Sequence, residues 1–272
     1  MTTQTLQTKD ELNIHLVNWS VENAKGSILI IHGLGEHSGR YNHFADYFNS
    51  IGYIVYAYDQ RGHGLSDGSR GHTPSQAHLH DDLDMVIDSI PTNATSRFFI
   101  LGHSFGGNVL CSYLLRRPNP KITGAILSSA FLKLAFEPPK LKVFLGKLVK
   151  SIIPQLSMKN ELKTIDLSYD LDAVKAYEND SLVHDRITPS LFVNAMNTGI
   201  ECLEQGQQIK VPLLIYHGED DKIISPEGSS ILASKTPNST FKMWEKTKHE
   251  PHNDLRKEEV MKFVGNWIES IQ

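Results

Sequence analysis

Apolar residues along the chain form short continuous runs that alternate with longer amphipathic stretches. The continuous runs predict strands buried on both faces and cover residues 27–31, 53–57, 98–101, 122–128 and 211–217. Residues 11–17 alternate between apolar and polar positions, which predicts a half-buried strand. Helical periodicity separates these runs at residues 41–50, 75–90, 108–115, 228–234 and 255–271. Because strands alternate with helices, we predict an α/β fold with a mostly parallel central sheet flanked by helices.

The alternation of strands and helices stops after Ala130 and resumes near residue 207. Between these points no run has the pattern of a buried strand, and helices are predicted at residues 141–153, 170–177 and 189–202. We therefore predict a helical cap, residues 131–206, inserted into a core made of residues 1–130 and 207–272. The alternative is that these helices are ordinary crossovers of the sheet.

The composition limits the classes of protein to which the chain can belong. Its 272 residues suit one large domain with an insertion, and 27 Lys and Arg against 31 Asp and Glu argue against nucleic acid as a partner. No apolar run is long enough to span a bilayer, and the first residues lack the pattern of a signal peptide. Cys111 and Cys202 follow no metal or redox spacing. We expect a cytoplasmic protein, and the sequence leaves its oligomeric state open.

The strongest chemical signal is the Gly-x-Ser-x-Gly pattern of Gly102, Ser104 and Gly106. It lies between a run that predicts a strand and a stretch that predicts a helix, so the backbone must turn sharply at Ser104. Only residues without a Cβ fit two positions either side of such a turn, which holds the hydroxyl where a base can reach it. The alternative is a glycine-rich turn that contains a serine by chance, which the flanking strand and helix disfavour.

Residues of complementary chemistry follow other predicted strands. A last strand is predicted at residues 240–244. His249 lies in the loop after it and is the candidate base, and Asp221 follows the buried run 211–217 and would orient the imidazole. The chain order Ser, Asp, His is that of α/β-hydrolases. The glycine-rich loop 32–39 follows the first buried run, so we predict an oxyanion hole formed by the N–H groups of Leu34 and Phe105.

Several of these positions have rivals in the sequence. Asp220 adjoins Asp221, and His252 lies close to His249, so each pair could exchange roles. We interpret His103 as the spacer inside the turn. One further group has residue types that bind metals: His72, His78, His80, Asp81 and Asp82. The acidic first turns of a helix explain this group better, because carboxylates favour that end. We therefore expect neither a metal nor a cofactor.

Taken together, these motifs resemble the monoacylglycerol lipase and lysophospholipase group of α/β-hydrolases. The matching stretches are residues 32–41, 59–64, 102–107, 217–221 and 248–250. They extend over almost the whole chain, and the first and third are specific in combination. The resemblance implies the α/β-hydrolase fold with an inserted cap. It also implies that the family's acid falls on Asp221, its base on His249 and its oxyanion donors on Leu34 and Phe105.

The resemblance further implies where the substrate would be held. Residues 148–157 and 177–180 resemble lid elements of the family. The positions that match its head-group contacts are Glu36, Tyr177 and His252. Ser181 stands where a proline is common in the family, and Leu34 where a smaller residue can occur. Both differences bear on the shape of the lid and on the volume of the acyl pocket, and neither bears on proton transfer.

We therefore predict a serine ester hydrolase that cleaves monoacylglycerols, or similar single-chain lipid esters, through an acyl-enzyme. An apolar pocket under the cap would remove the acyl chain from water at about 0.8 kcal/mol per CH₂. Enzymes with the same triad are one set of alternatives: a lysophospholipase, a thioesterase or a broad carboxylesterase. An aminopeptidase is another, for which Glu36 is the candidate to bind the substrate ammonium. A non-catalytic binding module with the same fold is the third.

The predicted helix at residues 141–153 suggests a peripheral contact with membranes. Its apolar residues fall on one face, and Lys140, Lys147 and Lys150 lie opposite. Such a pattern is typical of helices that rest on an anionic lipid surface. Simple packing of this helix on the sheet domain is the alternative.

Overall fold

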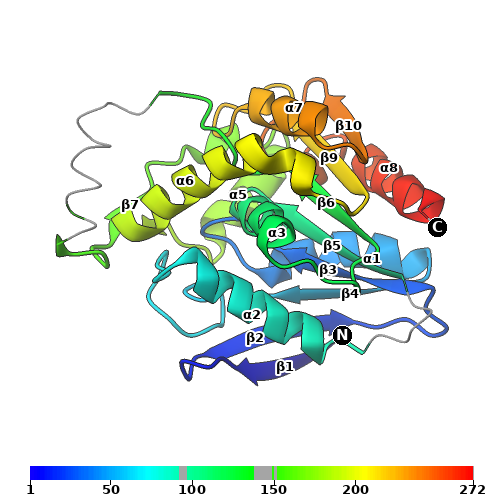
Figure 1. The fold of residues 1–272 in the computed structure, drawn as a ribbon, viewed down its shortest axis with the longest axis horizontal. Helices are drawn as coiled ribbons and strands as arrows, with labels where there is room; N and C mark the ends of the chain where they lie inside the picture. The colour runs from blue at the N-terminus through cyan, green and yellow to red at the C-terminus, as the bar shows by residue number, and fades with distance from the viewer. Residues whose placement is uncertain (92–96, 138–148, 150–151, 272) are drawn as a thin grey trace.

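The computed structural model describes residues 1–91, 97–137, 149 and 152–271. Its centre is a sheet of eight strands in the order β1-β2-β4-β3-β5-β6-β9-β10 (Figure 1). β2 is antiparallel to both of its neighbours, and every other neighbouring pair is parallel. The strands are β1 (Thr2–Gln7), β2 (Asn13–Trp19), β3 (Gly26–Ile31), β4 (Tyr53–Tyr58), β5 (Arg97–His103), β6 (Gly124–Ser128), β9 (Leu213–Gly218) and β10 (Ser239–Trp244). The mostly parallel sheet predicted from the sequence is confirmed.

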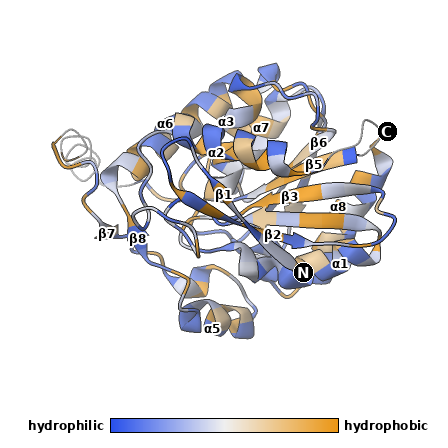
Figure 2. Cartoon of the chain, turned by 90° about the horizontal axis from the view of Figure 1, so that it is seen from below, coloured by the Kyte–Doolittle hydropathy of each residue, from blue (hydrophilic) through white to orange (hydrophobic). Residues whose placement is uncertain are grey.

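Helices cover both faces of this sheet (Figure 2). One face carries α1 (Asn42–Ser50) and α8 (Lys257–Ser270), and the other carries α2 (Gln76–Ser89), α3 (Phe105–Arg116) and α7 (Pro226–Lys235). Alternate side chains of a strand point to opposite faces, so the buried apolar residues divide into two clusters. In β3, Leu29 packs with α3, whereas Ile28 and Ile30 pack with α1 and α8. The continuous apolar run of β3 is therefore buried on both sides, as the sequence predicted.

The strand register brings the carboxyl ends of the central strands together. In β3, Ile31 pairs with Gly102 of β5, and His103 at the end of β5 pairs with Ser128 of β6. The glycine-rich loop after β3 and the turn at Ser104 therefore begin side by side. Open parallel sheets place their sites at this edge.

Between β6 and β9 the chain leaves the sheet. This stretch contains α5 (Leu171–Asn179), α6 (Pro189–Gln205) and two short antiparallel strands, β7 (Met158–Lys159) and β8 (Arg186–Ile187). Figure 2 shows α5, β7 and β8 beyond one end of the sheet. The helices predicted at 170–177 and 189–202 coincide with α5 and α6. The helix predicted at 141–153 lies largely outside the described residues.

α6 packs on a helix of the sheet domain. Nδ2 of Asn108, on α3, donates to the carbonyl of Ala195, on α6, over 2.9 Å. Cys202 of α6 lies against Cys111 of α3, and both are buried free thiols. Contact with Cys111, followed by burial, holds the pKa of the Cys202 thiol well above its ordinary value. α6 is therefore joined to the helix that begins directly after Ser104.

Some short or polar elements were not predicted from the sequence. β1 is polar and almost entirely exposed, so it lacks the apolar alternation of a half-buried strand and is held by backbone pairing with β2. β7 and β8 are each too short to show alternation. Short 3₁₀ helices occur at η1 (Ser38–Tyr41), η2 (Thr164–Asp166), η3 (Gly206–Gln208) and η4 (Pro251–Asn253).

Candidate active site

Ser104 lies at the junction of β5 and α3 with φ 49° and ψ −114°. Residues other than glycine rarely adopt such a backbone conformation, which typically costs about 1–3 kcal/mol. The neighbouring glycines make the turn possible. A Cβ on Gly102 would lie 2.5 Å from the carbonyl oxygen of Gly106, and a Cβ on Gly106 would lie 2.1 Å from that of Ile31. The predicted Gly-x-Ser-x-Gly turn therefore has the geometry of a nucleophile elbow, with Ser104 at its apex.

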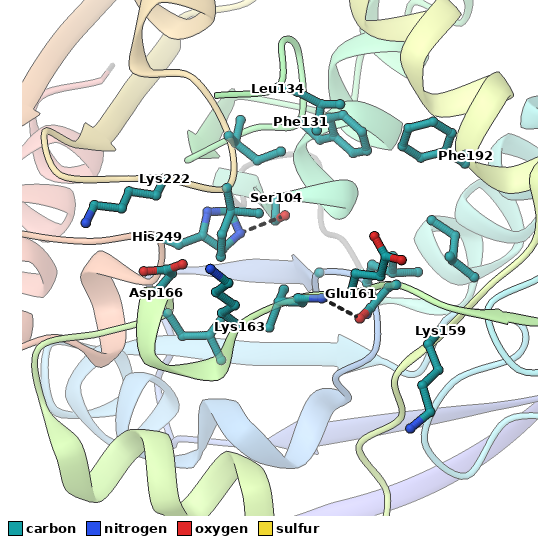
Figure 3. Close-up of a pocket in the computed structure, with 18 of the residues that line it drawn as sticks. Ser104, Phe131, Leu134, Lys159, Glu161, Lys163, Asp166, Phe192, Lys222 and His249 are labelled. Carbon is teal, nitrogen blue, oxygen red and sulfur yellow. Dashed lines mark hydrogen bonds between the residues drawn. The ribbon is translucent and has the colours of Figure 1, made fainter. Parts of the chain in front are cut away.

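Three side chains that are distant in the sequence meet at this apex. Nε2 of His249 lies 3.0 Å from Oγ of Ser104 (Figure 3), and Nδ1 of His249 donates to Oδ2 of Asp221 over 2.7 Å. A carboxylate only accepts, so Nδ1 carries the proton and Nε2 is left to accept the proton of the serine hydroxyl. All three residues are buried. The structure thus brings the predicted nucleophile, base and orienting acid within hydrogen-bonding distance.

Both oxygens of Asp221 are fixed by donors. Oδ1 accepts from the backbone N–H groups of Ile223 and Ile224 over 2.8 and 2.9 Å. Oδ2 accepts from Nε2 of His217 over 2.9 Å as well as from His249. Burial would raise the pKa of Asp221, but the attraction of His249 and these hydrogen bonds outweigh it and hold the pKa well below its usual range. Asp221 is therefore ionised at neutral pH.

His217 is a supporting residue that the sequence analysis missed. It lies at the end of β9, is completely buried and hydrogen-bonds through Nδ1 to Oγ of Ser229 over 2.7 Å. Since its Nε2 donates to Asp221, it fixes the carboxylate that orients His249. The signal in the sequence was its position within the matching stretch 217–221, in which only the acidic residues were assigned a role.

The structure also distinguishes between the rival candidates for the acid and for the base. Asp220 accepts from the hydroxyl of Tyr169 over 2.9 Å instead of from His249. The ring of His252 is buried, stacks on Tyr41 with 5.1 Å between centroids and meets the ring of His103 at 4.6 Å. Within the described chain, neither ring nitrogen of His252 has a hydrogen-bond partner. The geometry therefore favours Asp221 as the acid and His249 as the base.

The residues that suggested a metal take part in separate contacts. His80 hydrogen-bonds to Oγ of Ser112 over 2.8 Å, and Asp82 forms an ion pair with Arg61 over 2.6 Å. The other three residues of the group that suggested a metal are His72, His78 and Asp81. Across residues 1–91, 97–137 and 152–271, no group of three or more His, Cys, Asp or Glu is arranged to hold a metal ion. His80 and Asp82 instead join α2 to the neighbouring α3 and to the loop after β4.

Two backbone N–H groups are the candidates for the oxyanion hole: Phe105 follows Ser104 in the chain, and Leu34 lines the same cavity as Ser104. In the part of the chain that the structure describes, the N–H groups of Leu34 and Phe105 donate to no protein acceptor. The N–H of Gly33, by contrast, donates to Oε1 of Glu36 over 2.6 Å, which holds the glycine-rich loop in place. Phe105 is the first residue of α3, where N–H groups have no acceptor within the helix. Both predicted donors are thus available to bind an oxyanion.

A buried ion-pair network adjoins His249 and was not predicted. Arg40 donates to Oε2 of Glu36 over 2.8 Å and, through both terminal nitrogens, to the carboxylate of Glu250 over 2.7 Å. Its guanidinium also lies 4.7 Å from the centre of the Tyr177 ring. Because two carboxylates share one guanidinium, the network carries a net negative charge beside His249.

This charge affects the protonation of His249. Burial lowers the pKa of the imidazole, but Asp221, followed by Glu250 and Glu36, outweighs burial and raises the pKa above its ordinary value. The His103 ring packs 5.0 Å from that of His249, and burial followed by repulsion from His249 lowers its pKa to about 3. His103 is therefore neutral at pH 7 and adds no positive charge next to the base.

Ser104 and His249 open onto a cavity of about 850 Å³, a volume within the usual range for small-molecule sites. The apolar part of its wall includes Phe131, Leu134, Leu167, Ile187, Phe192 and Ile223. Charged side chains line another part (Figure 3): Lys159, Glu161, Lys163, Asp166 and Lys222. The cavity thus combines a large apolar surface with a charged region.

Two of the three predicted head-group residues reach this cavity. Glu36 and Tyr177 line it, whereas His252 does not. His252 is covered by Tyr41 and His103 and is 1% exposed, so it presents no surface to a ligand. We therefore withdraw His252 as a head-group contact. The oxygens of Glu36 are already bonded within the protein, because Oε1 accepts from Gly33 and Tyr41 and Oε2 from Arg40.

The chain is similar to known hydrolases over most of its length. The family model described as serine aminopeptidase, S33, matches residues 22–256. Phospholipase YtpA of Bacillus subtilis is 31% identical over 249 residues, which cover 90% of this chain and 95% of that protein. An abhydrolase domain-containing protein of Dictyostelium discoideum is 34% identical over 97% of this chain, which spans only 28% of that protein's length. The crystal structure of a monoacylglycerol lipase from Paleococcus ferrophilus has a TM-score of 0.87 and 34% identity, covering 95% of this chain and 99% of that one.

Proposed function

The chain belongs to the serine aminopeptidase S33 family and is a serine hydrolase with the α/β-hydrolase fold, and on this basis we propose that it hydrolyses monoacylglycerols to a fatty acid and glycerol. The observation that carries the proposal is the largely apolar cavity of about 850 Å³ that opens onto Ser104 and His249. Burial of an acyl chain in such a cavity contributes about 0.8 kcal/mol per CH₂. The similarity to the P. ferrophilus monoacylglycerol lipase supports the same substrate class.

In the proposed acylation step, Oγ of Ser104 attacks the ester carbonyl carbon. Nε2 of His249 takes the hydroxyl proton, and the carboxylate of Asp221 stabilises the imidazolium that forms. The carbonyl oxygen becomes an oxyanion and is bound by the N–H groups of Leu34 and Phe105. Loss of one such donor typically lowers kcat by about 10²–10³.

The second half of the reaction returns the enzyme to its starting state. The imidazolium of His249 protonates the glycerol oxygen, the ester C–O bond breaks and glycerol leaves. Water then attacks the acyl-enzyme while Nε2 of His249 takes its proton, and the second oxyanion collapses to release the fatty acid. The proton returns to Oγ of Ser104, so the reaction consumes one water.

We also propose that residues 131–206 act as a cap on a core of residues 1–130 and 207–272. Support comes from the cavity wall, to which both parts contribute: Ser104 and Leu34 from the core, and Leu167 and Tyr177 from the cap. The polar end of the cavity, at Glu36 and Tyr177, is the place that we propose for the glycerol head group.

A lysophospholipase is the second candidate function. The similarity to phospholipase YtpA supports it, as do Lys163 and Lys222, which line the cavity and carry the charge that a phosphate would require. An aminopeptidase fits the geometry less well. Glu36, the sequence's candidate for the substrate ammonium, is already paired with Arg40.

A substrate panel tests the proposal and its rival. Wild-type protein is given monoacylglycerols of short to long acyl chain, lysophospholipids of the same chains, a thioester and an aminoacyl amide. We expect the highest kcat/KM for a long-chain monoacylglycerol. Faster hydrolysis of a lysophospholipid with the same chain would replace the proposed function by the second candidate, and preference for the shortest ester would contradict both.

We further propose that the cap takes its substrate from a lipid surface. No helix among the described residues is both long enough and apolar enough to cross a bilayer. The support lies in large apolar side chains of the cap that are about half exposed, namely Met158, Ile165 and Leu171. In the same panel, each long-chain ester is offered as monomers and in anionic vesicles. The rate should rise on vesicles, and equal rates would contradict the contact.

The acidic limb of the pH profile should report on His249 and its charged neighbours. Nε2 must be unprotonated to accept the proton of Ser104, so kcat/KM falls as the pH drops through the pKa of His249. Burial lowers this pKa, but Asp221, Glu250 and Glu36 raise it. We therefore expect Glu250→Gln, which removes one negative charge, to move the acidic limb of kcat/KM to lower pH.

A surface carboxylate provides the matched control for this prediction. Glu259 on α8 is exposed and pairs with Arg256, so Glu259→Gln removes the same charge from a position outside the site. The acidic limb should stay where it is in Glu259→Gln. An unchanged limb in Glu250→Gln would show that the ion-pair network has no influence on the base.

A further inference from the structure

Lys248 attaches the loop that carries His249 to a short segment of the cap. Its Nζ donates to the carbonyl oxygens of Ile165 over 2.6 Å and Ser168 over 3.3 Å. The residue is 9% exposed, and among the described residues no carboxylate lies within ion-pair distance of it. A buried ammonium must be compensated by dipoles or charges. Here cap carbonyls supply the compensation, so the position of Lys248 depends on the cap.

The same loop is bonded to the cap on the other side of the histidine. We call residues 165–170 the anchor segment. The backbone N–H of Glu250 donates to the carbonyl of Leu167, in this segment, over 2.9 Å. The completely buried Asp254 also braces the loop, since its Oδ2 accepts from the backbone N–H of Lys248 over 2.8 Å. The two residues that flank His249 are therefore both hydrogen-bonded to the anchor segment.

Tyr169 extends this attachment to the loop that carries the acid. Its ring centre lies 4.2 Å from Nζ of Lys248, and its backbone N–H donates to Oδ1 of Asp254 over 2.9 Å. Its hydroxyl donates to Oδ2 of Asp220, next to Asp221 in the chain, over 2.9 Å. A single residue of the cap thus contacts the loops of both the base and the acid.

The anchor segment also forms part of the substrate cavity. Asp166 and Leu167 line the cavity together with His249, whereas Ser104 is held by the elbow between β5 and α3. An acyl chain that fills the cavity would therefore meet Leu167 of the anchor segment, which holds the loop of the base, whereas the nucleophile belongs to a different element. We propose that Lys248 and Tyr169 are positioning residues, which couple filling of the cavity by a long acyl chain to alignment of His249 with Ser104.

This coupling has a kinetic consequence. Misplacement of a reacting group by about 1 Å can lower the rate by about 10²-fold. Binding energy from a remote part of the substrate can offset such misplacement, and it then raises kcat as well as lowering KM. We therefore expect kcat itself to increase with acyl-chain length in the wild type. The inference rests on the proposed function, because it assigns chain sensing to that same site.

The test compares kcat for a long-chain and a short-chain monoacylglycerol in Lys248→Met. Methionine keeps an unbranched side chain but removes the charge and both hydrogen bonds to the anchor segment. We expect the ratio of kcat for the long chain to kcat for the short chain to fall by about 10- to 100-fold. A ratio equal to that of the wild type would overturn the inference.

Lys257→Met is the matched control. Lys257, on α8, pairs with Asp170 of the anchor segment over 3.0 Å, and among the described residues its ammonium forms no hydrogen bond to the loop that carries His249. The kcat ratio should be unchanged in this variant, and an equal fall would overturn the inference, because any loosening of the cap would then suffice. If circular dichroism shows that Lys248→Met is unfolded, Tyr169→Phe decides: a lowered ratio supports the coupling, and a wild-type ratio overturns it.

A second readout separates this inference from the proposed function. Rates of labelling by short-chain and long-chain alkyl fluorophosphonates depend on alignment of Ser104 with His249, whatever the natural ester is. Absence of monoacylglycerol hydrolysis with a normal labelling rate would remove only the proposed function. Labelling that is faster for the long chain in the wild type, but not in Lys248→Met, would still support the coupling. Labelling rates that keep their chain dependence in Lys248→Met would overturn it.

Discussion

Replacing Ser104 by alanine should lower kcat for monoacylglycerols by about 10⁶-fold and leave the fold intact. The change removes only the hydroxyl group, whose oxygen lies 3.0 Å from Nε2 of His249. The turn itself is held by backbone bonds, since the N–H of Ser104 donates to Ser128 and its carbonyl accepts from Asn108 and Phe131. Alanine can keep all of them. Turnover and circular dichroism measure these two effects. Labelling by a fluorophosphonate should be lost as well, because it requires the hydroxyl group.

Ser129→Ala is the matched control for the nucleophile. Like Ser104, Ser129 is a buried serine with positive φ, 44°, and its Oγ has no hydrogen-bond partner in the described residues. Its variant should label and turn over substrate like the wild type. Labelling that persists in Ser104→Ala would show that another residue is the nucleophile, and the proposed mechanism would then be wrong.

The strands and helices of the core were predictable because each carries its pattern locally. β3 is a continuous apolar run buried on both faces, and α2 begins at Gln76, directly after Ser75 and before a run of helical periodicity. β1 shows the limit of such reasoning. Its residues, Thr2–Gln7, are polar and exposed, and only pairing with β2 at the edge of the sheet makes them a strand. No local pattern contains that information.

In the predicted site, too, some residues could be identified from the local sequence and others could not. Ser104, Asp221 and His249 could be named because each follows a strand and the chain order is characteristic. The spacing of residues alone left Asp221 and Asp220 open, and the family resemblance pointed to Asp221. Both follow β9, and in the structure Asp221 is the one that hydrogen-bonds to His249. His252 was misjudged because its place in the motif gave no sign that Tyr41 would cover it.

The interactions that surround the triad were beyond sequence reasoning for a physical reason. Arg40 and Glu250 are separated by 210 positions, and nothing in either local sequence specifies the other as its partner. Lys248 would pass for an ordinary surface lysine until the anchor segment is placed over it. Both depend on how the cap and the loops converge, whereas each triad residue is marked in the sequence by the strand that precedes it. Residues that tune or position the base are therefore the least predictable part of the site.

Asp221→Asn should lower kcat by about 10⁴-fold, although the side chain keeps its size. Oδ1 accepts from the N–H groups of Ile223 and Ile224, so the amide oxygen of the variant must occupy that position. The NH₂ group then takes the place of Oδ2, which lies 2.7 Å from Nδ1 of His249, and donates to it. The proton of the neutral imidazole moves to Nε2. That nitrogen can no longer accept the proton of Ser104.

The same substitution should leave the fold nearly unchanged, which isolates its effect on proton transfer. The second partner of Oδ2 is Nε2 of His217, whose Nδ1 faces the hydroxyl of Ser229. A hydroxyl both donates and accepts, so His217 can exchange its tautomer and keep its bonds to residue 221 and Ser229, losing only the longer contact of Nε2 with the Ile224 carbonyl, 3.2 Å. Asp220→Asn is the control, because an amide oxygen still accepts from Tyr169, and its kcat should fall far less. A near-normal kcat in Asp221→Asn would mean that the acid does not set the tautomer of His249, and the mechanism would then need another source of orientation.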